Sequence, residues 1–155
     1  VACPYEGPIA PNAVRDVAAR LLDLGVDEID LGETIGVAVP TDVDRLYDAL
    51  DGLLTPERTT LHLHDTRGTA LACAYRALQR GVCSFDASCG GLGGCPYAPG
   101  AAGNLATEDL VYLCERMGVH TGVRLDQLVE AGREIAAALG RTLPGRVLGA
   151  VTGSS

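Results

Sequence analysis

Segments with helical periodicity alternate with short strand-like segments along most of the chain, and this alternation restricts the fold more than any other feature. The predicted helices cover residues 11–24, 40–50, 70–79, a segment from 107 onward and 125–139, and the predicted strands cover 1–3, 27–31, 59–64 and 83–88. Strands that alternate with helices favour a parallel sheet with right-handed crossovers. The sequence therefore predicts an α/β fold with about four βα units and a trailing helix.

Four such units form either a small open sheet or half of an eight-stranded (β/α)8 barrel. In both folds, ligands bind at the carboxyl ends of the strands. The unusual residues of this chain fall at those ends: Cys3, Glu33, His62, His64 and Ser88. We therefore expect the chemistry of the protein at one rim of the sheet.

The chain has 155 residues, enough for one domain with a hydrophobic core. We expect a partial barrel domain over residues 1–141 and a C-terminal tail over 142–155, frayed from Gly149 onward.

The charge pattern excludes several classes of function. The formal net charge is −8 and the basic residues are scattered singly, which argues against a nucleic-acid partner. All 12 basic residues are arginine, so the chain cannot use a Schiff-base lysine. No apolar run approaches the roughly 18 residues of a membrane span, so no membrane association is expected.

The six cysteines show no C-x-x-C spacing, and a structural zinc site is therefore not expected. A disulfide framework would suit a small secreted chain better than a chain of this size. We interpret the cysteines as thiols in a reducing compartment, the cytoplasm, with most of them acting as small buried apolar residues.

The HLH motif at 62–64 is the sharpest local signal. Residues i and i+2 of a strand point to the same side, so both imidazoles can converge on one ion. Two histidines suit zinc, manganese, iron or cobalt, and added oxygen ligands make the site harder. Asp65 could orient one imidazole from behind. The alternative is a half-exposed strand with two solvated histidines.

Three more polar residues lie at the expected rim. The spacing of Glu33 favours a helix-start or solvated turn acid over a catalytic carboxylate. Asn104 ends a glycine-rich loop, where an amide serves as a turn residue or as an oxygen ligand to a hard metal. Cys95 lies between glycines in this loop, which favours a partly exposed, reactive thiol over a buried structural one.

Four segments resemble, in order, the 3-hydroxy-3-methylglutaryl-CoA lyase family: CPYEG at 3–7, LGETIGV at 31–37, HLHDTRG at 62–68 and GLGGCPYAPGAAGNLATEDLVYL at 91–113. The cysteine-bearing glycine loop is the specific part. The H-x-H motif alone is similar to the wider group of metal-dependent lyases and condensing enzymes on TIM barrels. The resemblance implies the C-terminal half of such a barrel, with strands five to eight. The length of the chain agrees, since a whole barrel needs about 250 residues.

The resemblance also implies roles for single residues. His62 and His64 match the histidine metal ligands, and Asn104 matches the amide ligand, for a divalent ion that is expected to be Mg²⁺ or Mn²⁺. His62 is also the expected base for the substrate hydroxyl. Cys95 matches the cysteine that protonates the acetyl-CoA carbanion. Glu33 stands where the family usually carries an aspartate that assists proton transfer, so its role is left open.

The implied activity is metal-dependent cleavage of 3-hydroxy-3-methylglutaryl-CoA to acetoacetate and acetyl-CoA. The family's first strands carry an arginine–aspartate pair that lies outside the resemblance, so this chain alone is expected to be inactive. Its expected partners are an acyl-CoA substrate and either further copies of itself or the missing N-terminal half. Two alternatives remain: a condensing enzyme similar to isopropylmalate or homocitrate synthase, and a non-catalytic half-barrel binding module.

Overall fold

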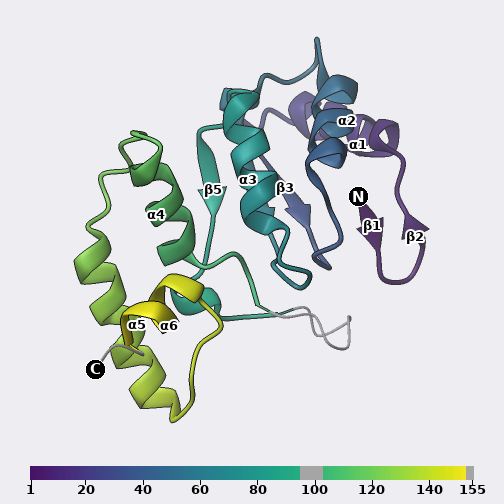
Figure 1. The fold of residues 1–155 in the computed structure, drawn as a ribbon. Helices are drawn as coiled ribbons and strands as arrows, with labels where there is room; N and C mark the ends of the chain where they lie inside the picture. The colour runs from purple at the N-terminus through teal and green to yellow at the C-terminus, as the bar shows by residue number, and fades with distance from the viewer. Residues whose placement is uncertain (95–102, 153–155) are drawn as a thin grey trace.

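The computed structural model describes residues 1–94 and 103–152 (Figure 1). Its elements are β1 (Ala2–Cys3), β2 (Gly7–Pro8), α1 (Pro11–Asp23), β3 (Ile29–Glu33), α2 (Pro40–Leu50), η1 (Pro56–Arg58), β4 (Thr59–Leu63), α3 (Ala70–Gln79), β5 (Ser84–Asp86), η2 (Cys89–Gly91), α4 (Thr107–Arg116), α5 (Leu125–Leu139) and α6 (Arg146–Thr152).

The central element is a parallel sheet with the strand order β3-β4-β5. Leu31 of β3 lies opposite Leu61 of β4, which in turn lies opposite Phe85 of β5. Helices α2 and α3 connect these strands, as parallel pairing requires. The predicted α/β fold with parallel strands is confirmed.

Helices cover one face of this sheet. Helix α2 packs between α1 and α3, and α3 also contacts β4 (Figure 1). Burial alternates along β3, where Ile29 and Leu31 lie in the core while Asp30 and Gly32 are exposed. The period-two alternation of a strand therefore leaves one face apolar under the helices and the other face open and polar. In a closed (β/α)8 barrel, this second face lines the interior.

The start of the chain differs from the expectation. Residues 1–3 were expected to belong to the parallel set, but Ala2–Cys3 pairs antiparallel with Gly7–Pro8. Gly7 has φ of +75°, a left-handed conformation that favours glycine, and lies where the chain returns along β1. The parallel sheet of the described residues thus has three strands rather than four.

The C-terminal segment also differs from the expectation, because its residues 146–152 are not frayed but form helix α6. This helix packs against α4 and α5. Leu148 is buried in a second apolar cluster together with Val129 and Leu143. Burial of the Leu148 side chain stabilises this segment as a helix. The local sequence, which contains Gly and Thr, does not predict a helix there, because the stabilisation is tertiary.

The other boundaries agree closely with the sequence. Helices α3 and α5 cover the residues expected. Thr107 is the first residue of α4, and Ala106 takes the cap position without a side-chain hydrogen bond. The Thr107 N–H donates to Ser88 O at 2.9 Å, which ties the start of α4 to the segment between β5 and η2.

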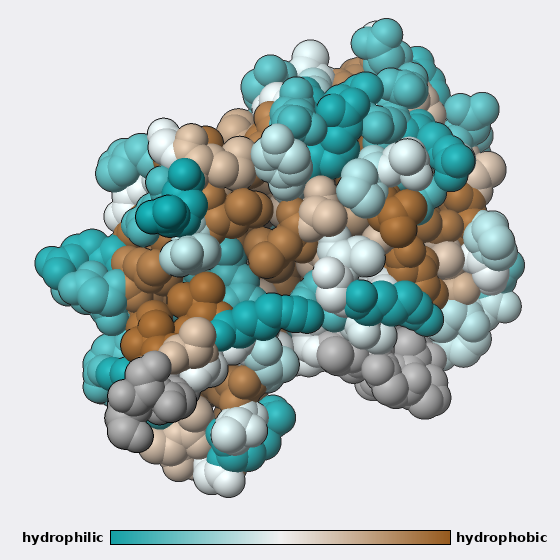
Figure 2. Space-filling view, in the orientation of Figure 1, coloured by the Kyte–Doolittle hydropathy of each residue, from teal (hydrophilic) through white to brown (hydrophobic). Residues whose placement is uncertain are grey.

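Apolar side chains also reach the surface. Figure 2 shows them gathered between α4 and α5, where an open groove of about 740 Å³ is lined by Tyr112, Leu125, Val129, Val147 and Val151 among others. None of the helices in the described part of the chain is long and apolar enough to cross a bilayer.

Candidate functional site

His62 and His64 come from the carboxyl end of β4 and its continuation. Their ring centroids lie 5.0 Å apart, so both imidazoles occupy one side of the strand, as the i, i+2 spacing predicts. His64 is buried, whereas the side chain of His62 is 31% exposed. The structure therefore brings the two histidines together, and the expectation of two solvated histidines is wrong for His64.

A backbone carbonyl sets the tautomer of His64. Its Nδ1 lies 2.8 Å from the carbonyl oxygen of Glu33, at the end of the neighbouring strand β3. A carbonyl oxygen only accepts hydrogen bonds, so Nδ1 carries the proton and Nε2 keeps a free lone pair. A metal-binding histidine is held in the same way, by a second hydrogen bond that fixes the ring.

Asn104 lies beside His64, with which its backbone forms an isolated antiparallel bridge. Its Nδ2 donates to Leu92 O at 3.0 Å, and this bond fixes which end of the amide faces the site. The other end, Oδ1, is buried and has no hydrogen-bond partner among the described residues. A buried oxygen without a donor calls for a further partner, and a divalent cation is one that an amide oxygen suits.

Glu33 is the last residue of β3 and is buried, with 6% exposure, so the interpretation as a solvated turn acid is wrong. Its Oε1 accepts a hydrogen bond from the Val37 N–H at 3.0 Å. The carboxylate thus holds the turn that follows β3, while its backbone carbonyl holds His64.

Asp65 was expected to orient an imidazole, but its carboxylate and the neighbouring Arg67 hold backbone groups. Asp65 Oδ1 instead accepts the N–H of Ala70 at 2.9 Å, at the start of α3. Arg67 donates to the carbonyl oxygens of Ile35 and Gly36, both at 3.1 Å. The two residues fix the loops that border the site.

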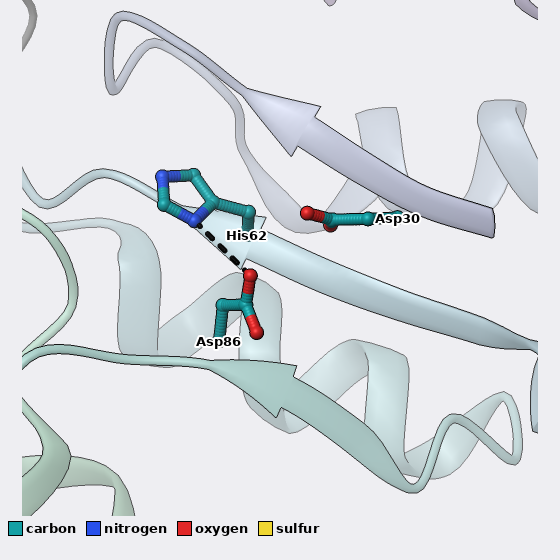
Figure 3. A group of neighbouring side chains, drawn as sticks. All are labelled: Asp30, His62 and Asp86. Atoms are coloured by element: carbon teal, nitrogen blue, oxygen red, sulfur yellow. Dashed lines mark ion pairs between the residues drawn. The ribbon is translucent and has the colours of Figure 1, made fainter. Parts of the chain in front are cut away.

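Sequence reasoning missed a second group of side chains. Asp30, His62 and Asp86 project from the neighbouring strands β3, β4 and β5 toward one another (Figure 3). One ligand atom from each lies within 4.8 Å of the other two, and His62 Nδ1 lies 3.6 Å from Asp86 Oδ2. The sequence did contain an indication of this group, because Asp30 and Asp86 each alternate along their strands with apolar residues that face the helices. Acids in that position predict a polar, inward-facing side of the sheet.

The electrostatics of this group are those of crowded carboxylates. Partial burial and the neighbouring Asp86 carboxylate raise the pKa of Asp30 above 3.8, while His62 opposes the shift. The site therefore carries excess negative charge on its open face, which favours a cation there.

Asp30, His62 and Asp86 are thus one group of neighbouring side chains that could hold a cation. The set expected from the sequence, His62, His64 and Asn104, stays a prediction that the His62–His64 ring contact and the His64–Asn104 bridge support. Nitrogen and oxygen donors of this kind suit Mg²⁺, Mn²⁺ or Zn²⁺. The orphaned oxygen of Asn104 and the fixed tautomer of His64 both fit a divalent cation, so the residues present are compatible with a metal site.

Cys95 lies outside the described residues. Of the cysteines that the structure describes, Cys73 and Cys114 are buried and all are free thiols. Burial, reinforced by the charge of Glu33, raises the pKa of Cys73 to about 12. Burial and a bond to Glu108 raise the pKa of Cys89 to about 11. Both remain protonated at neutral pH. The expectation that most cysteines are small buried residues holds for Cys73 and Cys114, whereas Cys3 and Cys89 are half-buried and Cys83 is exposed.

Comparison with known proteins places this geometry in a family. The family model described as HMGL-like matches residues 1–135. The chain is 47% identical over 146 residues to a hydroxymethylglutaryl-CoA lyase of Bacillus subtilis, covering 94% of this chain and 49% of that protein. It is 47% identical over 145 residues to an (R)-citramalyl-CoA lyase of Chloroflexus aurantiacus, covering 94% of this chain and 46% of that protein.

A solved structure extends the similarity to three dimensions. The chain matches an HMG-CoA lyase of Acinetobacter baumannii, determined in complex with coenzyme A and 3-methylmalate, with a TM-score of 0.89 and 43% identity. The match covers 94% of this chain and 48% of that one.

The chain spans about half the length of the curated relatives that it matches. Its three parallel strands and their helices are thus about half of the barrel of this family, as the sequence predicted. The chain belongs to the HMGL-like family.

Proposed function

We propose that the chain supplies the C-terminal half of the active site of a metal-dependent 3-hydroxy-3-methylglutaryl-CoA lyase. The observation that carries the proposal is the buried Oδ1 of Asn104 beside His64, for which the described residues supply no hydrogen-bond donor. Similarity to a lyase of that name over 94% of the chain supports the same reading. His62, His64 and Asn104 would hold the cation, for which we propose Mg²⁺ or Mn²⁺. When bound, it would act as a Lewis acid toward the substrate oxygens.

Side chains of this chain would carry out the proton transfers. His62 would take the proton of the tertiary hydroxyl, and the carbon–carbon bond would then break with its electron pair left on the thioester fragment. That step forms the ketone of acetoacetate and the enolate of acetyl-CoA. Cys95 would donate its thiol proton to the enolate carbon before the fragments recombine. Glu33 would assist by holding the turn at Val37 and the ring of His64.

His62 has two proposed roles, ligand and base, that compete for one lone pair. A neutral imidazole has a single nitrogen lone pair, so a ring that has given it to a cation cannot accept a proton in the same step. The neighbouring Asp86 carboxylate, 3.6 Å from Nδ1, is placed to stabilise the imidazolium that a base would form. The geometry therefore favours His62 as the base during turnover.

A second substrate deserves a direct test, because the citramalyl-CoA lyase relative is as similar in identity as the Bacillus subtilis protein. Its name describes cleavage of another CoA thioester. The acidic side chains of Asp30 and Asp86 on the inward face would contact the acyl portion in a closed barrel.

We also infer that the chain acts together with an N-terminal half-barrel and an acyl-CoA substrate. The match to a structure that holds coenzyme A supports the substrate class. The free thiols of Cys73, Cys83 and Cys114 support a reducing compartment, for which we propose the cytoplasm.

The test is a single-chain chimera in which the N-terminal half of the Bacillus subtilis relative precedes Val1. With Mn²⁺ and 3-hydroxy-3-methylglutaryl-CoA, it should form acetoacetate and acetyl-CoA in equal amounts. (R)-citramalyl-CoA should be assayed in parallel, and the chimera carrying His64→Ala serves as the inactive control. A folded chimera that cleaves neither thioester would refute the proposal.

A further inference from the structure

Glu108 is a buried carboxylate that the proposed chemistry does not use. It lies in the first turn of α4 with no measurable exposure, where the sequence suggests an acid that faces the helix N-terminus. Instead, its two oxygens accept the N–H of Gly90 at 2.9 and 2.8 Å, and Oε1 lies 3.3 Å from the thiol of Cys89. None of the ion pairs among the described residues includes Glu108.

The position of this carboxylate is tightly constrained. A buried carboxylate is costly unless donors satisfy it, and here the donors are the backbone N–H of Gly90 and the thiol of Cys89, both in η2. Helix α5 closes the other side, because a Cβ added to Gly132 would lie 2.7 Å from Glu108 Oε1. Glu108 therefore cannot turn away from Gly90 without losing its donors, and Gly90 cannot move without leaving a buried carboxylate unpaired.

The segment held in this way reaches the candidate metal site within two residues. Gly90 and Gly91 have φ of 64° and 72°, left-handed conformations that carry the chain sharply to Leu92. Leu92 O accepts the hydrogen bond from Asn104 Nδ2 at 3.0 Å. The two segments touch, since a Cβ on Gly103 would lie 1.7 Å from Gly91 O. The orientation of the Asn104 amide thus depends on where Gly90 is held.

We propose that Glu108 is a positioning residue that fixes Gly90–Leu92 and thereby turns the Asn104 oxygen toward the cation. It touches neither the cation nor the substrate and acts through the carbonyl of Leu92. Only the cation in this statement rests on the proposed function, whereas the link from Glu108 to the Asn104 amide stands on the hydrogen bonds themselves.

Asp109, the next residue, provides a matched control. It is also a buried acid of α4 that accepts two backbone N–H groups, those of Arg146 at 3.1 Å and Val147 at 2.7 Å. These donors belong to α6 and not to η2. Glu108→Gln and Asp109→Asn each replace one acceptor oxygen by an NH₂ donor, so both should lower the melting temperature, but only the first should disturb Asn104.

The first measurement needs no metal. In the ¹⁵N-labelled chimera, Glu108→Gln should speed exchange of the Asn104 side-chain amide hydrogens by up to about tenfold, the scale of one lost hydrogen bond. Asp109→Asn should leave that exchange at the wild-type rate. Equal acceleration in both variants, or none in Glu108→Gln, would overturn the proposal.

The second measurement is the affinity for Mn²⁺, followed by the electron spin resonance signal of the free ion. Glu108→Gln should weaken binding by about 10- to 100-fold, the usual range for a residue behind a metal ligand, while Asp109→Asn should not. A chimera with this chain's wild-type residues that binds no Mn²⁺ but shows the Asn104 exchange effect would remove the metal site from the proposed function and leave Glu108 as the residue that orients Asn104. Unchanged Mn²⁺ affinity in Glu108→Gln beside a wild type that binds would refute its positioning role.

Discussion

His64 and Asn104 face each other as a single antiparallel bridge, although 40 residues of sequence separate them. The bridge joins the residue that follows β4 to the segment that leads into α4. Leu105 N donates to Leu63 O at 2.8 Å and extends the same contact by one residue on each side. The imidazole and the amide are therefore carried on one rigid piece of backbone, which is what a metal site requires of its ligands.

The unpartnered oxygen of Asn104 leads to the first prediction. Asn104→Ala should weaken Mn²⁺ binding by at least about 10-fold, because it removes a proposed metal ligand itself and not merely a residue that orients a ligand. Isothermal titration calorimetry measures the affinity. Asn12→Ala, on the exposed surface of α1, is the control and should leave it unchanged. Equal affinities in the two variants would contradict the ligand assignment.

The three histidines of the chain permit a second test. His64→Ala should abolish most Mn²⁺ affinity, whereas His120→Ala should have no effect, since His120 is exposed beyond α4. If His62 is the base and not a permanent ligand, His62→Ala should change Mn²⁺ affinity by less than about twofold while lowering chimera turnover by about 10² or more. Loss of affinity in His62→Ala would instead identify it as a ligand.

The crowded carboxylates predict a pH dependence of stability. Partial burial and Asp86 raise the pKa of Asp30, so the folded chain binds this proton more tightly than the unfolded chain does. Stability then falls as pH rises from near 3.8 through the folded pKa. Asp30→Asn should therefore be more stable than the wild type at pH 7, and the difference should vanish below pH 3.8. Thermal melts across this range measure it, with the exposed Asp16→Asn as the control.

Cys95 is expected to act as the proton donor. In the chimera, Cys95→Ala should lower turnover by roughly 10² or more, the scale of a positioned acid, with a much smaller change in substrate affinity. Cys83→Ala changes an exposed thiol that lies just before β5 and should retain wild-type turnover. If Cys95→Ala turns over at the wild-type rate, Cys95 has no role in the chemistry.

The open sheet predicts association of the isolated chain. Strands β3 and β5 are the sheet's edges, and the apolar side chains of Val17 in α1 and of Leu24, which follows this helix, are 57% and 81% exposed. Unpaired edges and exposed apolar surface drive pairing with another chain. Light scattering should show oligomers or aggregates, and an added N-terminal half from a relative should convert them to a one-to-one complex. A monodisperse monomer that cleaves the thioester unaided would contradict both the half-barrel fold and the divided active site.

Local sequence was sufficient for most of the elements. Helices α3 and α5 begin and end as their apolar spacing and following glycines predict, and the i, i+2 spacing of His62 and His64 placed both rings on one side. The expectations that were wrong concern segments whose structure depends on distant partners. Residues 146–152 are helical because Leu148 is buried against α4 and α5, and residues 1–3 pair with Gly7–Pro8 rather than with β3.

The sequence by itself determined the alternation of strands and helices and the chemical identity of the rim residues, because side-chain period and composition are local properties. Only the tertiary structure decided which groups meet. Parallel pairing brings Asp30 and Asp86 to His62 from separate strands, and a backbone bridge places Asn104, whose buried oxygen has no donor among the described residues, beside His64. Glu108 and Asp109 read as simple helix-start acids in the sequence, yet burial turns them into acceptors for backbone N–H groups of η2 and α6, since a buried carboxylate must find its donors wherever the fold supplies them.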